Sequence, residues 1–214
     1  MHRQFFKKQI ILLTLQIEKA DSILLNQVGV YFQDLHNNQD ISEAMKKENN
    51  PVYDRNTLEF VTVALEYCTF VESANRSELL DFVDKATKIL PLLYLKASLL
   101  PAIEPDELFE PEMSVTEEMY ESVRSSIAAL LEDKDSYLDT FHPDMAYSET
   151  PIIAFISENL ADVYQDVGNF VSLFRQGNEF VMRETIGLCY QNFCNYWGQP
   201  LLNALKALHH LRYA

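Results

Sequence analysis

Glycine is scarce in this chain, with five residues in 214. No two glycines lie close enough to form a loop that cradles phosphate groups, which excludes the dinucleotide-binding and P-loop mechanisms. The Gly-x-Ser-x-Gly elbow, the paired histidines of metalloproteases and the Glu-x-x-His motif of di-iron bundles are also absent. The sequence therefore offers no recognisable catalytic motif.

Cysteine is also rare, and long apolar runs are missing. The three cysteines, Cys68, Cys189 and Cys194, are odd in number and fall within apolar helical patterns, so we expect reduced, buried thiols in a reducing compartment. No run reaches the roughly 18 apolar residues of a membrane span. The apolar run Ile10 to Leu13 is too short for a signal peptide and has no cleavage site after it. We expect a soluble, cytoplasmic protein.

Basic residues are too few to balance the acids. The chain has 17 lysines and arginines against 32 carboxylates, a net charge of −15. Residues 104–149 hold 14 carboxylates against Arg124 and Lys134 only, whereas residues 1–50 carry six charges of each sign. A local field of this sign repels phosphate backbones and anionic lipids, so we expect neither nucleic-acid nor membrane binding. A basic protein partner would be attracted, although an acidic surface can also serve solubility alone.

The clearest helix lies between residues 150 and 177. Ser148 and Thr150 can cap its start, Pro151 suits a first helical position, and Gly177 can end it. Apolar residues at alternating steps of four and three form a face that must be buried: Ile156, Leu160, Val163, Val167, Phe170 and Phe174. The opposite side carries Glu158, Asp162, Asp166 and Asn169, and we expect it to be solvated.

Capping signals predict helices on both sides of this one. Asn56 with Glu59 opens a helix over residues 58–72, and Ser114 with Glu117 opens another after a crossing loop over residues 102–113. Between them, residues 79–100 form a helix that Pro91 either kinks or divides in two. A kinked helix keeps Lys96 on the rim, whereas a divided one would give it a buried carboxylate partner.

Two more helices are expected after Gly177. Asn178 caps the first, whose apolar positions are Met182, Ile186, Cys189, Phe193 and Tyr196. Gly198 closes it and Pro200 opens the last helix. No segment shows the alternation typical of a strand.

Together these patterns predict an all-α, single-domain bundle. We expect about six to eight mostly antiparallel helices over residues 55–214. Residues 1–36 form an N-terminal helical arm with a long apolar seam, and residues 37–54 form a polar linker.

Two groups of residues are candidates for a site. Asp139, His142, Asp144 and Glu149 share one acidic loop and could bind a divalent ion, although a histidine in such a loop is usually only solvated. Tyr164, Tyr190, Tyr196 and Trp197 could line a small-molecule pocket, although aromatics at this spacing usually belong to a core. No cofactor is expected from either group.

Several segments carry a resemblance to a known family: LEFVTVALEYCTFVE, ILPLLYLKASLLP, VTEEMYESVRSSIAALLEDKDSYLDTFHPDM and NYWGQPLLNAL. Over residues 52–211 the chain resembles an uncharacterised family of acidic, all-helical bacterial proteins known as a domain of unknown function. The resemblance brings no activity and no site residue. We therefore predict a non-enzymatic cytoplasmic binding protein whose acidic segment meets a basic partner, with a divalent-metal hydrolase using the carboxylates around His142 as the alternative. The sequence does not determine its oligomeric state.

Overall fold

The computed structural model describes residues 50–139 and 152–214. Contacts divide the chain into two units, Met1–Asn49 and Asn50–Ala214, and the described residues all belong to the second. The expected arm and most of the expected linker lie outside the described residues. The 3₁₀ turn η1, Pro51–Tyr53, already belongs to the compact unit, since Val52 is fully buried.

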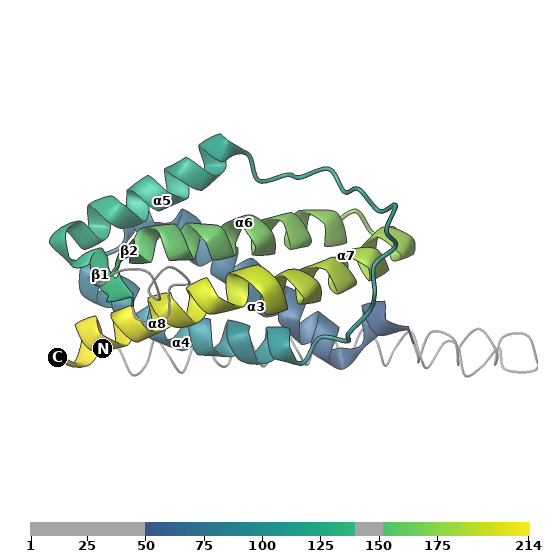
Figure 1. The fold of residues 1–214 in the computed structure, drawn as a ribbon, viewed down its shortest axis with the longest axis horizontal. Coiled ribbons are helices and arrows are strands. Elements are labelled where there is room, and N and C mark those ends of the chain that lie inside the picture. Colours follow the sequence, from purple (N-terminus) through teal and green to yellow (C-terminus); the bar gives the residue numbers. More distant parts are fainter. Residues whose placement is uncertain (1–49, 140–151) are drawn as a thin grey trace, which may run out of the picture. The chain divides into compact units, whose positions relative to one another are not determined.

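The described residues contain six α-helices (Figure 1). They are α3 (Arg55–Glu72), α4 (Leu79–Ser98), α5 (Glu117–Leu131), α6 (Ile156–Phe174), α7 (Glu179–Asn192) and α8 (Gly198–Tyr213). Short 3₁₀ turns follow α3 and α5, namely η2 (Ala74–Arg76) and η3 (Glu132–Lys134), and a π-helical segment, η5 (Phe193–Trp197), joins α7 to α8. The prediction of an all-α bundle is confirmed, but α7, η5 and α8 form one continuous rod, so the separate helices are slightly fewer than predicted.

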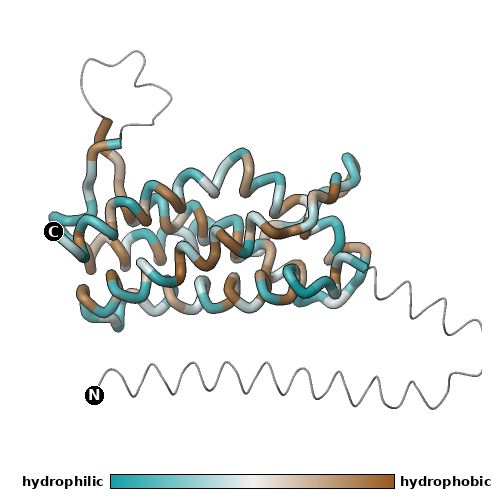
Figure 2. The backbone as a smooth tube through the Cα atoms, turned by 90° about the horizontal axis from the view of Figure 1, so that it is seen from below, coloured by the Kyte–Doolittle hydropathy of each residue, from teal (hydrophilic) through white to brown (hydrophobic). Residues whose placement is uncertain are grey.

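Helix α6 is the centre of the bundle. It packs against α3, α5, α7 and α8, while α4 completes the bundle against α3 and α8 (Figure 1). Figure 2 shows apolar and polar residues alternating along each helix, which is the pattern of helices that are apolar on one side. Each element therefore needs its neighbours to remove its apolar side from water.

The predicted apolar face of α6 is buried throughout. Its six residues, Ile156, Leu160, Val163, Val167, Phe170 and Phe174, are all between 0% and 9% exposed. The Phe170 and Phe60 rings pack in a T-shaped arrangement with 5.0 Å between centroids. The Tyr67 hydroxyl donates to the Leu160 carbonyl at 2.7 Å. At about 1.5–3 kcal/mol for each large apolar side chain, this face is a main source of stability.

The start of α6 differs from the prediction. The helix begins at Ile156, and the residues before it form a strand, β2 (Ile152–Phe155), antiparallel to β1 (Ser136–Asp139). The expectation that no strand would occur is therefore wrong. The run Ile-Ile-Ala-Phe has high strand propensity, and it pairs with β1 in the register Tyr137 to Ala154. Ser148, Thr150 and Pro151 lie outside the described residues.

Two other helix starts are shifted by the choice of cap. The Asp54 carboxylate accepts from the Asn56 N–H at 2.9 Å, so α3 begins before the predicted Asn56–Glu59 capping box. Glu59 instead binds Lys96 of α4 at 2.5 Å, and α4 runs through Pro91 without a break. The helix is undivided, yet Lys96 is half-buried and has a carboxylate partner, so each alternative is met in part. Helix α5 is capped by Thr116, not by Ser114.

After α6, the predicted turn at Gly177 is confirmed, but the predicted end of a helix at Gly198 is not. Gly177 has a positive φ of 72° and Asn178 caps α7. Gly198 does not end a helix: a Cβ there would lie 2.5 Å from the Phe193 carbonyl oxygen, so close packing within the π-helical segment requires the glycine. The π-helical segment also shifts the apolar face of this helix by one residue. Tyr196, which was predicted to be an apolar core position, is 68% exposed, and Trp197 is buried in its place.

Candidate functional site

The crossing loop, residues 101–116, is fastened to the bundle at several points. The Asp106 N–H donates to the Glu184 carboxylate of α7 at 2.5 Å. The Ile103 carbonyl lies so close to Gly187 that a Cβ there would be 2.6 Å away. At the other end, the N–H groups of residues 114 and 115 donate to Asn169 Oδ1 of α6 at 2.8 and 2.9 Å. The loop thus holds a defined course over α7 and α6 (Figure 1).

Glu184 was not identified from the sequence, because a glutamate beside an arginine usually marks a solvated helix face. It is only 1% exposed, and Arg183 donates to its carboxylate at 2.5 Å. A buried carboxylate needs such donors to offset the loss of water. Glu184 therefore has a structural role, which is to anchor the crossing loop.

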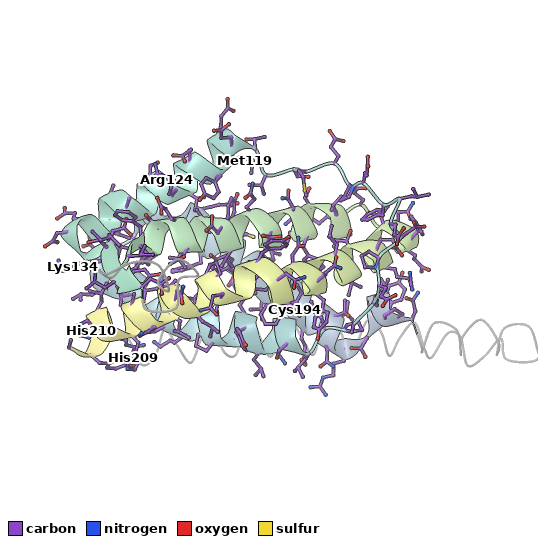
Figure 3. The ribbon with its side chains drawn as sticks, viewed as in Figure 1. Met119, Arg124, Lys134, Cys194, His209 and His210 are labelled. Atoms are coloured by element: carbon purple, nitrogen blue, oxygen red, sulfur yellow. The ribbon has the colours of Figure 1, made fainter. Side chains whose placement is uncertain are left out.

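Exposed carboxylates are distributed along this loop, along α5 and along the turn after α5. We call them the acidic lobe; they are Glu104, Asp106, Glu107, Glu110, Glu112, Glu117, Glu118, Glu121, Glu132 and Asp133. The two cations of this part of the chain, Arg124 and Lys134, are labelled in Figure 3. Each is paired with a lobe carboxylate, Arg124 with Glu121 at 2.7 Å and Lys134 with Asp133 at 3.4 Å. The lobe keeps a large excess of negative charge.

Two carboxylates of the same segment do not join the lobe. Asp135 is 6% exposed and Asp139 is 7% exposed. Asp135 accepts from the Ser157 backbone and hydroxyl, at 2.8 and 2.6 Å. The sequence predicted an acidic loop that contains Asp139, and Asp135 was counted only within the acidic segment over residues 104–149. Both residues are buried inside the fold.

The polar side of α6 is less solvated than predicted. Glu158 is exposed, but Asp162 and Asp166 are half-buried and Asn169 is 8% exposed. The Tyr120 hydroxyl donates to Asp162 at 2.8 Å, and Asn192 donates to Asp166 at 2.7 Å. Burial raises the pKa of both aspartates, and these hydrogen bonds oppose the rise. The polar side of α6 therefore binds α5 through Asp162 and α7 through Asp166.

The predicted metal ligands are described only in part. Asp139 lies at the end of β1 and accepts from Asn203 of α8 at 3.4 Å. His142, Asp144 and Glu149 lie outside the described residues. Among residues 50–139 and 152–214, no three histidine, cysteine or acidic side chains form a group that could hold a metal ion. The metal hypothesis therefore stays a prediction.

The candidate aromatic residues do not share one environment. Tyr164 and Trp197 are buried, Tyr190 is half-buried, and Tyr196 is exposed. The Tyr164 hydroxyl donates to Glu72 at 2.8 Å, and Trp197 packs against Phe193 with 4.8 Å between centroids. They are mainly core residues.

A shallow groove that the sequence did not reveal lies between α4 and α8. It has a volume of about 580 Å³ and is lined by Thr87, Pro91, Leu202, Leu205, Lys206, His209 and Tyr213. Tyr213 is flanked by His209, with 4.7 Å between ring centroids, and by the Arg212 guanidinium at 4.9 Å. Figure 3 places His209 near the C-terminal end of α8. Lys206 is the lysine of the groove lining, and the neighbouring Arg212 is paired with Asp84.

The three thiols are free, but their burial differs. Cys68 and Cys189 are buried, whereas Cys194 is exposed, which corrects the expectation of three buried thiols. Burial raises the pKa of Cys68 to about 12 and that of Cys189 well above its usual value.

None of the helices that the structure describes is long and apolar enough to span a membrane.

Comparisons with known proteins give a family without an activity. Residues 51–214 match the family described as "Domain of unknown function (DUF5063)". The crystal structure of protein BF1032 from Bacteroides fragilis is similar, with 42% sequence identity and a TM-score of 0.68, over 77% of this chain and 96% of that one. No curated protein matches. The chain belongs to the DUF5063 family of domains of unknown function.

Proposed function

We propose that this protein is a non-enzymatic, cytoplasmic binding protein whose acidic lobe binds a basic protein partner. The observation that carries the proposal is the lobe itself, in which ten exposed carboxylates face water and the two nearby cations are already paired. Such a surface attracts cationic side chains and repels phosphate and anionic lipid, so the partner is neither a nucleic acid nor a membrane.

The attachment of the lobe supports this role. The crossing loop is bound to Glu184 and Asn169, and α5 is bound to α6 through Tyr120 and Asp162. A surface that is already ordered loses less conformational entropy when a partner binds. The carboxylates are thus presented on a rigid support.

Charge attraction of this kind acts mainly on association. A single exposed ion pair contributes only about 0–1 kcal/mol, so affinity requires several pairs together. Complementary fields also raise the association rate and discriminate against partners of the wrong sign. We therefore expect a partner with several cations in one segment.

The test uses a synthetic lysine-rich peptide and two variants of the full chain. One variant neutralises lobe residues (Glu107→Gln, Glu110→Gln and Glu112→Gln), and the control neutralises the same number of exposed carboxylates elsewhere (Glu66→Gln, Glu78→Gln and Asp81→Asn). Isothermal titration calorimetry should show weaker binding for the lobe variant than for the control. Equal weakening in both would show that only the net charge matters, and the proposed site would be wrong.

A further inference from the structure

Apolar side chains are exposed at the end of the bundle where the crossing loop meets α7. Leu108 is 89% exposed, Phe180 is 57% exposed and Tyr53 is 41% exposed. Phe109 packs edge-on against Phe180, with 6.2 Å between ring centroids and an interplanar angle of 85°. We call these four residues the aromatic end patch.

The patch is held in place by hydrogen bonds. The Tyr53 hydroxyl donates to Glu179 of α7 at 2.8 Å, and the Leu108 N–H donates to Asp106 Oδ1 at 2.9 Å. Asp106 is itself anchored through its N–H to buried Glu184 at 2.5 Å. The Leu108 side chain therefore projects from a fixed turn into water.

The surroundings of the patch are acidic. Glu107 and Glu110 flank Leu108 and Phe109 in the sequence, and Glu179 precedes Phe180; all three are exposed. The nearby Arg183 is paired with Glu184 at 2.5 Å. Exposed apolar side chains within a polar rim are typical of interaction sites, and aromatic residues often supply most of the binding energy there.

We infer that the aromatic end patch is the apolar anchor point of the acidic lobe, and that its partner is a basic protein segment carrying apolar side chains at regular intervals. This inference rests on the proposed function, because the patch continues the lobe at Glu107 and Glu110. Cations of the segment pair with the lobe carboxylates, while its apolar residues cover Leu108 and Phe180. A purely polar basic segment would leave these two side chains in water.

Two synthetic peptides of equal length and equal lysine content test the inference on the full chain. One carries leucines at helical spacing and the other carries serines at the same positions. The leucine peptide should bind at least about tenfold more tightly, because covering a single large apolar side chain supplies a difference of this size. Leu108→Ser with Phe180→Ser should remove that preference. Leu80→Ser with Tyr196→Ser, which alters two apolar residues that are also more than half exposed but lie elsewhere, should preserve it.

The outcomes separate the two proposals. Equal binding of both peptides to the wild-type chain would overturn the aromatic end patch as an anchor and leave the acidic lobe as a binding surface. Binding of neither peptide would overturn the proposed function and the inference with it. A preference for leucine that survives in the Leu108 and Phe180 variant would place the apolar contact elsewhere and overturn the inference alone.

Discussion

Asp135 caps helix α6 from outside it. Its carboxylate accepts the Ser157 N–H at 2.8 Å and the Ser157 hydroxyl at 2.6 Å, although the two residues are 22 positions apart. The Asp135 carbonyl also accepts from the Ile156 N–H at 2.9 Å. The first turn of the central helix is therefore completed by the residue that precedes β1.

Replacing Asp135 should destabilise the fold. Asp135→Ala removes two hydrogen bonds at a buried helix start, and we expect a loss of about 1–3 kcal/mol in the free energy of unfolding. Urea denaturation measures this loss. Asp133→Ala, two residues earlier and exposed, should change the free energy by less than about 0.5 kcal/mol. Similar losses in both variants would contradict the capping role.

The half-buried aspartates of α6 should make stability depend on pH. Burial raises the pKa of Asp162 and Asp166 above 3.8, so the folded state holds these protons more tightly than the unfolded state does. Their contribution to stability is complete below about pH 3.8 and is lost as the pH rises through the folded values. Relative to wild type, Asp162→Asn should therefore gain stability as the pH rises from that region to neutrality.

Tyr120 provides a check on the same group. The hydrogen bond from the Tyr120 hydroxyl lowers the pKa of Asp162, so Tyr120→Phe should raise this pKa further. The free energy of unfolding should then fall more steeply as the pH rises. Urea denaturation across the pH range measures both variants. A pH profile that is identical in wild type and Asp162→Asn would show that Asp162 does not contribute.

The thiols should differ in reactivity. Only Cys194 of the three is exposed, and burial raises the pKa of Cys68 and Cys189, which keeps them protonated. A chromogenic disulfide reagent should label one thiol in the native protein and three after denaturation. Cys194→Ser should abolish the native labelling, and rapid labelling of two thiols would contradict the packing around Cys68 or Cys189.

The sequence predicts the apolar face of α6 correctly because helical periodicity is a local property. It fails at the start of α6, where the cap is Asp135, 22 positions before Ser157. At α3 the error is local, because the cap is Asp54 and not the predicted Asn56. The burial of Trp197, where the sequence predicted Tyr196, has a different cause. A π-helical turn contains an extra residue, which moves the buried face of the helix by one position.

The candidate site was predictable only as a charge excess. The sequence predicts the acidic segment over residues 104–149, but it does not predict the burial of Asp135, Asp162 and Asp166. Burial depends on which helix packs on which face of its neighbour. No local sequence pattern predicts that α5 packs on the polar side of α6. The aromatic end patch was missed for the same reason, because Phe109 and Phe180 meet only in the fold.

The metal hypothesis makes a separate prediction. If Asp139, His142, Asp144 and Glu149 bind a divalent ion, then Mg²⁺, Mn²⁺ or Zn²⁺ should raise the Tm, because an ion that binds only the folded state stabilises it. Asp144→Ala should abolish that gain. Thermal shift measurements with each ion decide the matter, and an unchanged Tm in all three would end the hypothesis.

The most direct test of the acidic lobe is the salt dependence of binding to a lysine-rich peptide. Exposed charges are screened over about 10 Å at 0.1 M salt and over about 3 Å at 1 M. If the lobe carboxylates attract the partner, the Kd should increase steadily across this range, and it should increase less for the variant lacking Glu107, Glu110 and Glu112. A Kd that stays constant with salt would contradict the proposed function.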